Sequence, residues 1–252
     1  MSISVRNLVY RYQGFELRVP ALELEGAGLT TIVGPNGAGK TTLLKCVSAI
    51  LPTPRGTVFI DGCDLAALPA TERARRLAFV PQEHSSAFNY AVLDFVLMGR
   101  AAYVPLFSTP SEADAAAARE ALEFVGLARY ASRAYTQLSS GERRLVLIAR
   151  ALAQRSDILI LDEPTTFLDP RHETELLELV RKLAVEKRKT VLMTLHNLDM
   201  AVRYSDTLVF LKEGRVVAAG TPDAVLTEEL LARVYEIPMD ILEHAGRKFI
   251  VK

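Results

Sequence analysis

One eight-residue stretch constrains the fold of this chain more than any other part of its sequence. Residues 34–41 read Gly-Pro-Asn-Gly-Ala-Gly-Lys-Thr and fit the phosphate-binding pattern G-x-x-x-x-G-K-[ST] at every position. The apolar run 29–33 predicts a buried strand, and the residues that follow the stretch have apolar side chains at helical spacing until Pro52. A strand, a glycine-rich turn and a helix N-terminus form an anion site, because backbone N–H groups and the helix dipole face the ligand. The chain is therefore predicted to bind a nucleotide.

The residue types in this stretch indicate what each position contributes to binding. Glycines allow the backbone to approach the phosphates without a side chain in the way. Lys40 is expected to reach the β- and γ-phosphates, and the hydroxyl of Thr41 is expected to hold Mg²⁺. The predicted nucleotide contacts here are Gly34, Pro35, Asn36, Gly37, Ala38, Gly39, Lys40, Thr41 and Thr42.

Composition narrows the class of protein. A chain of 252 residues, half of them apolar, can form one large α/β domain with a substantial core. The formal net charge is zero, which gives no reason to expect nucleic acid as a partner. Cys46 and Cys63 fit no metal-ligand spacing and suit a reducing compartment, with Cys46 expected inside the first helix. No stretch of about 18 uncharged apolar residues occurs, so the chain is not expected to span a membrane.

Strands alternate with helices along most of the sequence, which predicts an α/β fold with a mainly parallel sheet. The N-terminal strands are expected to form an antiparallel part. After Gln82 the pattern changes to helices, which predicts an inserted all-helical subdomain at 83–156 between core segments 1–82 and 157–252. Predicted strands lie at 3–12, 16–25, 29–33, 56–60, 77–80, 158–161, 190–195, 207–211, 215–219 and 248–251, and helices at 92–99, 111–126, 140–154, after 169, after 197 and at 227–235.

Two carboxylates follow the apolar strand 158–161. Ligands gather at the carboxyl ends of strands in open α/β sheets, so Asp162 and Glu163 are candidates for chemistry. Asp162 suits Mg²⁺, and Glu163 could polarise the water that attacks the γ-phosphate. A solvated acidic turn is the structural alternative, which is less favoured downstream of a phosphate-binding loop.

Two further strands deliver polar residues to the same kind of position. Gln82 follows the strand 77–80, and its amide could contact Mg²⁺ and the attacking water. His196 follows the strand 190–195, and its imidazole could hydrogen-bond the γ-phosphate. A lone glutamine is usually a surface residue and a lone histidine is usually structural. Gln82 and His196 are therefore functional candidates only because other strands also deliver polar residues to this edge of the sheet.

A further candidate phosphate site precedes the amphipathic stretch 145–152. Ser139 and Glu142 have the spacing of a capping box, which by itself predicts a well-capped helix. The same helix N-terminus, with a hydroxyl and Gly141 beside it, can also receive a phosphate. Asp169 and Pro170 mark the start of another helix.

The order of these motifs along the chain resembles that of the ATP-binding subunit of ABC transporters. The resemblance extends from Tyr12 to about Ile237. In that family residues 34–41 correspond to Walker A, and Asp162 and Glu163 end Walker B. The remaining matches are Gln82 with the Q-loop, residues 139–142 with the signature, Leu168 and Asp169 with the D-loop, His196 with the switch histidine, and Tyr12 with an aromatic residue that stacks on adenine.

The resemblance implies partners. Two copies are expected to pair head to tail, so that Ser139, Ser140, Gly141 and Glu142 of one copy close over ATP held by the other. Hydrolysis is expected to drive two transmembrane permease subunits through the segment after Gln82, and an extracytoplasmic substrate-binding protein would act indirectly. The expected location is peripheral, on the cytoplasmic face of the cell membrane.

The signature departs from the usual Leu-Ser-Gly-Gly-Gln at Ser140 and Glu142. Ser140 adds a side chain where glycine allows close phosphate approach, and Glu142 replaces a neutral amide with a charge. Activity is expected to survive, because Ser139 and Gly141 remain.

The tract from Phe79 to Arg100 resembles the large-importer branch of the family, which takes up iron–siderophore, haem and cobalamin. Molybdate or tungstate import is the alternative within that branch. A soluble ABC ATPase of DNA repair or translation is disfavoured, because coiled-coil insertions and a second cassette are not found. A nucleotide-binding regulatory module without turnover is disfavoured by Glu163 and His196, and a small-molecule kinase leaves the signature unexplained.

Overall fold

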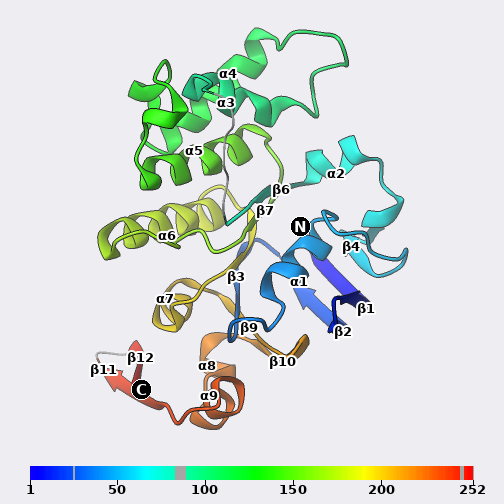
Figure 1. Cartoon of the computed structure of the whole chain (residues 1–252), viewed down its shortest axis with the longest axis vertical. Helices are drawn as coiled ribbons and strands as arrows, with labels where there is room; N and C mark the ends of the chain where they lie inside the picture. The colour runs from blue at the N-terminus through cyan, green and yellow to red at the C-terminus, as the bar shows by residue number, and fades with distance from the viewer. Residues whose placement is uncertain (25, 83–88, 245–246, 252) are drawn as a thin grey trace. The chain divides into compact units, whose positions relative to one another are not determined.

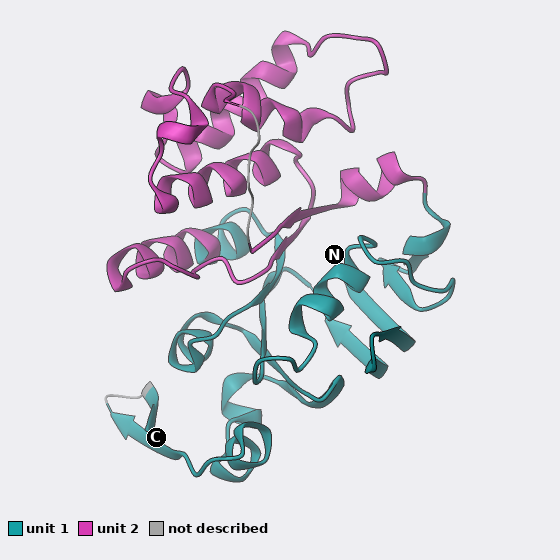
Figure 2. Cartoon of the chain, in the orientation of Figure 1, with its two compact units in different colours: residues 1–68, 181–252 teal, residues 69–180 magenta. Residues whose placement is uncertain are grey.

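The computed structural model describes residues 1–24, 26–82, 89–244 and 247–251 (Figure 1). The chain separates into two compact units (Figure 2). Unit 1 comprises residues 1–68 and 181–252, and unit 2 comprises residues 69–180.

Unit 1 begins with an antiparallel hairpin. β1 (Ile3–Tyr12) pairs with β2 (Phe15–Leu24) from Ile3 opposite Leu24 to Tyr12 opposite Phe15. Gln13 and Gly14 form the turn, and both have positive φ, which suits the tight hairpin turns that match strand twist. The strand order in this unit is β5-β4-β1-β2-β10-β9-β3-β8, with β3 at Gly28–Val33, β4 at Val58–Ile60, β5 at Cys63–Asp64, β8 at Thr190–Thr194, β9 at Thr207–Lys212 and β10 at Arg215–Gly220.

The strand β3 lies in parallel between β8 and β9. Its apolar side chains Leu29, Ile32 and Val33 are buried, as expected for a parallel strand covered on both faces. Because β3 runs directly into the phosphate-binding stretch, this buried pairing fixes where that stretch starts.

The helices of unit 1 include α1, which contains the predicted buried cysteine. Cys46 is fully buried, and burial raises the pKa of its thiol to about 12, which makes it an unreactive packing residue. The helices are α1 (Lys40–Val47), η1 (Leu65–Ala67), α7 (Leu198–Tyr204), α8 (Pro222–Val225) and α9 (Glu228–Tyr235).

A C-terminal hairpin follows α9. β11 (Asp240–His244) pairs antiparallel with β12 (Arg247–Val251), and together they form the red segment in Figure 1. β12 packs against α7. The sequence predicts only a strand at 248–251. β11 was not predicted, because four of its five residues are exposed and its side chains show no clear apolar alternation.

Unit 2 contains a parallel strand pair and most of the helices. β6 (Leu77–Val80) pairs with β7 (Ile158–Leu161), and β7 is buried along its whole length. The helices are α2 (Ala70–Arg76), α3 (Val92–Leu97), η2 (Met98–Arg100), α4 (Glu112–Phe124), η3 (Ala128–Tyr130), η4 (Tyr135–Gln137), α5 (Ser140–Ala153) and α6 (Pro170–Val185), whose last turn belongs to unit 1. α2 was not predicted, because it is short and buries no apolar face.

A buried ion pair joins the helices of unit 2. The Arg100 guanidinium contacts the Asp114 carboxylate at 2.9 Å and donates to the Ala153 carbonyl at 2.9 Å. Gly99 lies so close to α5 that a methyl group there would come within 2.1 Å of the Arg150 carbonyl oxygen. α3 and η2, α4 and α5 therefore pack as one body around Arg100.

The predicted fold class is confirmed: the chain is α/β, with parallel strands, an N-terminal antiparallel part and a helical part. The predicted boundaries of the helical subdomain stay a prediction, and the one at residue 83 lies outside the described residues. Within the described ranges, no helix has the length and apolar character that crossing a bilayer requires.

Candidate nucleotide site

The phosphate-binding stretch is built as the sequence predicts, between β3 and α1. Lys40 begins α1, and its buried ammonium group donates to the carbonyl oxygens of Gly34 at 2.9 Å and Pro35 at 3.0 Å. The loop thus folds around the lysine. Gly39, at φ 102°, precedes the helix, and among the described residues no side chain caps it. An uncapped helix start beside a lysine is the arrangement that receives phosphate oxygens, so the residues present fit a nucleoside phosphate.

Two glycines of this loop are required by their surroundings. A methyl group on Gly34 would lie 2.0 Å from the Leu211 carbonyl oxygen, and the residue has a φ of 153°. A methyl group on Gly39 would lie 2.7 Å from Cζ of Phe15. The atom that a methyl group on Gly34 would meet belongs to the backbone and not to a movable side chain, so this position tolerates only glycine.

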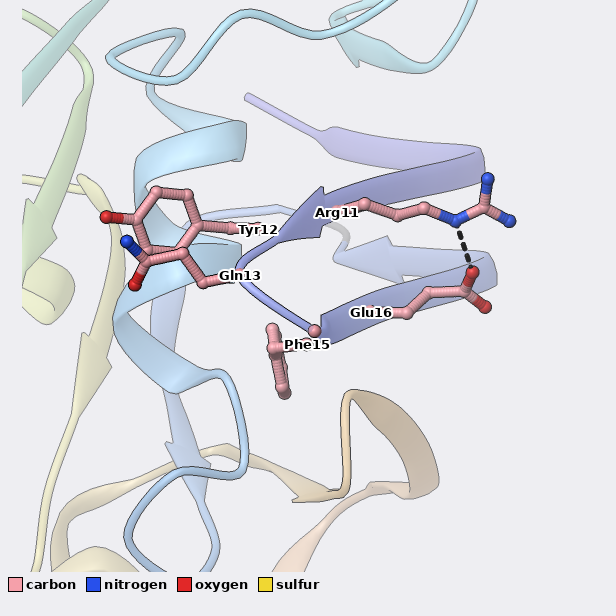
Figure 3. A pocket seen from close by; sticks show the side chains of 6 residues that line it. Arg11, Tyr12, Gln13, Phe15 and Glu16 are labelled. Atoms are coloured by element: carbon pink, nitrogen blue, oxygen red, sulfur yellow. Dashed lines mark hydrogen bonds and ion pairs between the residues drawn. The ribbon is translucent and has the colours of Figure 1, made fainter.

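The turn of the β1–β2 hairpin forms a pocket of about 360 Å³. Tyr12 and Gln13 line it together with Phe15, and Figure 3 shows Tyr12 and Gln13 on the side of the turn opposite Arg11 and Glu16. The Tyr12 side chain is 60% exposed, which leaves its ring face open to a ligand. Arg11 bonds Glu16 at 2.7 Å, and this hydrogen bond holds the pKa of the Glu16 carboxyl below its usual value.

Phe15 was missed by sequence reasoning. It packs on Gly39 and so connects the hairpin turn to the phosphate loop. The sequence does show an aromatic residue directly after the turn at Gln13 and Gly14. This residue indicates a contact with the phosphate loop only once the hairpin is known to lie beside that loop. The structure thus brings the pocket at Tyr12 and the phosphate loop together within unit 1.

In unit 2, Asp162 and Glu163 follow β7 and are both buried, with exposed fractions of 2% and 6%. The Gln82 side-chain amide donates a hydrogen bond to the Glu163 carboxylate, and the Thr166 hydroxyl donates to the same oxygen at 3.3 Å. Glu163 also has a φ of 46°, a conformation that costs energy in a non-glycine residue and tends to occur at functional sites. The structure therefore joins two of the three predicted catalytic residues, Gln82 and Glu163.

Arg144 of α5 was also missed. Its guanidinium donates to the backbone carbonyls of Pro81 at 2.8 Å and of Gln82. It is buried, so it fixes the backbone that presents Gln82. A single arginine on a helix gives no sequence signal for such a long-range contact.

The predicted capping box at the start of α5 is present. The Ser139 hydroxyl accepts from the Glu142 N–H at 3.2 Å, and the Ser139 N–H donates to the Glu142 carboxylate at 2.8 Å. The bond from the Ser139 backbone lowers the pKa of Glu142. Glu142 therefore completes the capping box with Ser139 as the N-cap, while Ser140 is exposed.

Asp169 forms the start of α6. Its carboxylate accepts from the backbone N–H groups of Arg171 at 3.0 Å and His172 at 3.1 Å, and it contacts His172 Nδ1 at 2.5 Å. The His172 side chain, followed by its backbone, lowers the pKa of Asp169. A pocket of about 460 Å³ is lined by Gly141 and Glu142 together with Leu168 and His172, so the signature and the Leu168–Asp169 segment face one cavity.

His196 lies after β8 in unit 1, and its side chain is exposed. Asn197 caps α7, the helix predicted after residue 197, by accepting from the Met200 N–H at 3.2 Å. His196 lines a pocket of about 190 Å³ with Tyr235, Met239 and Ile250 of the C-terminal segment. The predicted site residues thus divide between the units, and how those of unit 1 and unit 2 combine stays a prediction. Unit 1 holds the phosphate loop, Tyr12 and His196, and unit 2 holds Gln82, Ser139, Ser140, Gly141, Glu142, Asp162, Glu163 and Asp169.

The fold and this set of residues define a nucleotide-binding α/β protein with a phosphate-binding loop. The sequence profile described as ABC transporter matches residues 17–166, and the chain belongs to this family.

Named relatives agree with this assignment. The chain is 40% identical to the hemin import ATP-binding protein HmuV of Myxococcus xanthus over 98% of this chain and 94% of that protein. It is 43% identical to the cobalamin import ATP-binding protein BtuD of Halobacterium salinarum over 82% of this chain, but it spans only 52% of that protein's length.

Solved structures show the same fold. A metal-chelate type ABC transporter in an inward-facing conformation matches with a TM-score of 0.86 and 31% identity, over 99% of this chain and 96% of that one. The dimeric ATP-binding cassette MJ0796, bound to ADP and phosphate after hydrolysis, matches with a TM-score of 0.72 and 26% identity, over 87% of this chain and 98% of that one.

Proposed function

We propose that this chain binds and hydrolyses ATP and thereby powers import of a metal chelate across a membrane. The observation that carries the proposal is the buried Glu163 after β7, whose carboxylate accepts a hydrogen bond from Gln82 after β6, in a chain whose phosphate loop is already folded around Lys40. A binding module without turnover would not need a buried carboxylate held by an amide, because burying such a group is costly.

ATP binding is assigned to unit 1. Tyr12 stacks on the adenine, and Lys40 with the N–H groups at the start of α1 binds the phosphates. Displacing Lys40 from the carbonyls of Gly34 and Pro35 gives its ammonium group to the β- and γ-phosphates instead.

Mg²⁺ accompanies the ATP, with Thr41, Asp162 and Gln82 as its protein ligands. The hydroxyl, carboxylate and amide oxygens of these three residues fit Mg²⁺, which usually takes one or two carboxylates together with the substrate phosphates. When bound, the ion neutralises charge that develops on the phosphates.

Glu163 orients the attacking water and accepts its proton, and the hydrogen bonds from Gln82 and Thr166 hold its carboxylate in place. His196 contacts the γ-phosphate. A second copy of the chain completes each site with Ser139, Ser140, Gly141 and Glu142, while Asp169 contributes near the same nucleotide. The dimeric cassette that matches this fold supports that pairing.

ATP hydrolysis by this chain drives two transmembrane permease subunits. The chain lies peripherally on the cytoplasmic face of the membrane, bound to these subunits. An extracytoplasmic binding protein delivers the cargo. The relatives' names, hemin and cobalamin import, favour a metal chelate over molybdate or tungstate.

The test is phosphate release from MgATP by the purified chain and by its Lys40→Ala variant. Turnover by the wild type that Lys40→Ala abolishes is expected. A wild type that binds ATP without releasing phosphate would identify a regulatory module instead. Uptake by proteoliposomes with the cognate permease, comparing haem, cobalamin, a ferric siderophore and molybdate, then decides the cargo.

A further inference from the structure

Three successive backbone carbonyls at the end of β6 each accept a hydrogen bond. The Val80 carbonyl accepts from the Asp162 N–H at 2.9 Å, as part of the pairing of β6 with β7. The next two carbonyls, of Pro81 and Gln82, accept from the guanidinium group of Arg144, the first of them at 2.8 Å. The segment that leads to Gln82 is therefore held both to β7 and to α5.

The guanidinium group of Arg144 has the shape that this segment requires. Successive carbonyls of an extended strand point to opposite sides, so one group binds both only where the chain bends, and the chain bends at Gln82. Arginine carries its N–H donors in a rigid planar fork, and Nη1 of Arg144 binds Pro81 while Nη2 binds Gln82. Arg144 is buried, and hydrogen bonds from a charged donor are the stronger ones. Arg144 therefore fixes this bend.

Gln82 passes the constraint on to the buried carboxylate of Glu163. The Gln82 side-chain amide donates to Glu163, and the Thr166 hydroxyl donates to the same carboxylate oxygen at 3.3 Å. Gln82 is thus held at two points, at its backbone carbonyl by Arg144 and at its side-chain amide by Glu163. A shift of the backbone at Gln82 must either break the contact with Glu163 or move the carboxylate with it.

We propose that Arg144 is a positioning residue for ATP hydrolysis, acting on Glu163 through Gln82. The inference rests on the proposed function, which gives Glu163 the role of general base and places Gln82 beside Mg²⁺ and the attacking water. Arg144 lies on α5 two residues after Glu142. The helix that carries the signature therefore also sets the place of the catalytic pair in the same copy of the chain.

This role separates turnover from nucleotide binding. The residues assigned to ATP binding, Tyr12 and Lys40, lie in unit 1, whereas Arg144, Gln82 and Glu163 all lie in unit 2. Loss of the Arg144 contacts is therefore expected to lower kcat and to leave the affinity for the fluorescent analogue mant-ATP unchanged. The affinity is measured without Mg²⁺, because Gln82 is itself a proposed ligand of the ion.

The first variant is Arg144→Lys, which keeps the charge but can reach only one of the two carbonyls. Its kcat for phosphate release is expected to fall about 10-fold, the effect of losing one charge-assisted hydrogen bond, with an unchanged mant-ATP affinity. Arg144→Gln, which has no charge to bury, gives the same test where the lysine variant does not fold.

Arg143→Lys is the matched control. Arg143 is the neighbouring arginine of α5, it is exposed, and it donates to the Thr136 carbonyl at 2.7 Å, away from the segment at Gln82. Its kcat is expected to equal that of the wild type. A wild-type kcat in Arg144→Lys, or an equal loss in both lysine variants, overturns the proposal.

A double-mutant cycle tests whether Arg144 acts through Gln82. In the background of Gln82→Ala the amide that contacts Glu163 is already gone, so adding Arg144→Lys is expected to lower kcat by less than about 2-fold. Phosphate release is followed with radiolabelled ATP, which detects slow turnover. Independent effects would multiply, and the full loss of about 10-fold in the double variant would overturn the proposal. A general loss of stability would affect both backgrounds alike, so it does not produce the expected result.

Hydrogen exchange separates this proposal from the proposed function, because it needs no turnover. In the nucleotide-free protein, the amides of residues 77–82 are expected to exchange about 10-fold faster in Arg144→Lys than in the wild type, and at the wild-type rate in Arg143→Lys. A wild type without turnover overturns the ATPase assignment, while the exchange rates still decide whether Arg144 holds the segment. Normal turnover in the wild type, with unchanged kcat or unchanged exchange in Arg144→Lys, overturns the positioning role alone.

Discussion

The side chain of Lys40 organises the phosphate-binding loop. A buried ammonium group is costly unless it is paired, and here the carbonyls of Gly34 and Pro35 provide that pairing. Both carbonyls belong to the phosphate-binding loop itself. The loop is therefore formed before any phosphate arrives, which reduces the ordering cost of binding.

Gly34→Ala is predicted to disrupt this loop. The added methyl group would lie 2.0 Å from a backbone oxygen, so the backbone must move, at a cost of about 1–3 kcal/mol for strain of this kind. Because the loop is distorted, its affinity for the fluorescent ATP analogue mant-ATP is expected to fall. Gly56→Ala is the control, because Gly56 also has positive φ but a methyl group would meet no described atom within 4 Å. Equal affinity losses in both variants would contradict the steric account.

The signature departures are predicted to be functionally silent. In a Ser140→Gly, Glu142→Gln double variant, glutamine can still accept from the Ser139 N–H and so preserve the capping box. The phosphate-release rate is expected to equal that of the wild type. A large gain in rate would mean instead that Ser140 and Glu142 impair the native site.

At the scale of elements, the helices that were predicted start within one residue of the predicted position, whereas α2, α8 and the contacts between elements were not predicted. Ser111 with Asp114, and Ser139 with Glu142, form the capping boxes that their spacing indicates. The phosphate loop was predictable for the same reason, since its glycines and lysine act within a few residues.

The contacts made by Phe15 and Arg144 were not predictable from the sequence. Arg144 donates to backbone carbonyls that lie about 60 residues earlier in the sequence. Such contacts depend on which elements pack together, and neither spacing nor periodicity encodes that. β11 was missed because a small exposed hairpin leaves little apolar alternation in its sequence.

The pair of Arg100 and Asp114 is predicted to make the helical part sensitive to acid. Hydrogen bonds from Ser111 and then from Arg100 lower the pKa of Asp114 to about 2. In the unfolded chain an aspartate has a pKa of about 3.9, so this carboxylate stabilises the fold above about pH 4, and the stabilisation is lost as pH falls toward 2. The thermal midpoint of Asp114→Asn is expected to lie below that of the wild type at pH 7, with the gap narrowing below pH 4. A gap that is constant with pH would contradict this origin.

At the scale of the whole molecule, each unit holds only part of the proposed site. Unit 1 holds the phosphate loop, Tyr12 and His196, while unit 2 holds the pair of Gln82 and Glu163 and the signature. In the proposed head-to-tail dimer, the signature of one copy completes the nucleotide site of the other. Hydrolysis then separates them, and blocking it should preserve the pair.

The Glu163→Gln variant tests this pairing. Glutamine keeps an oxygen that can accept from Gln82 but cannot take a proton from water, so ATP should bind and persist. The variant is measured with MgATP by size-exclusion chromatography and light scattering, with ADP as the control. With ATP we expect a mass of twice the 27.7 kDa of the chain, and with ADP the mass of one chain. A variant that binds ATP yet keeps the mass of one chain would contradict it.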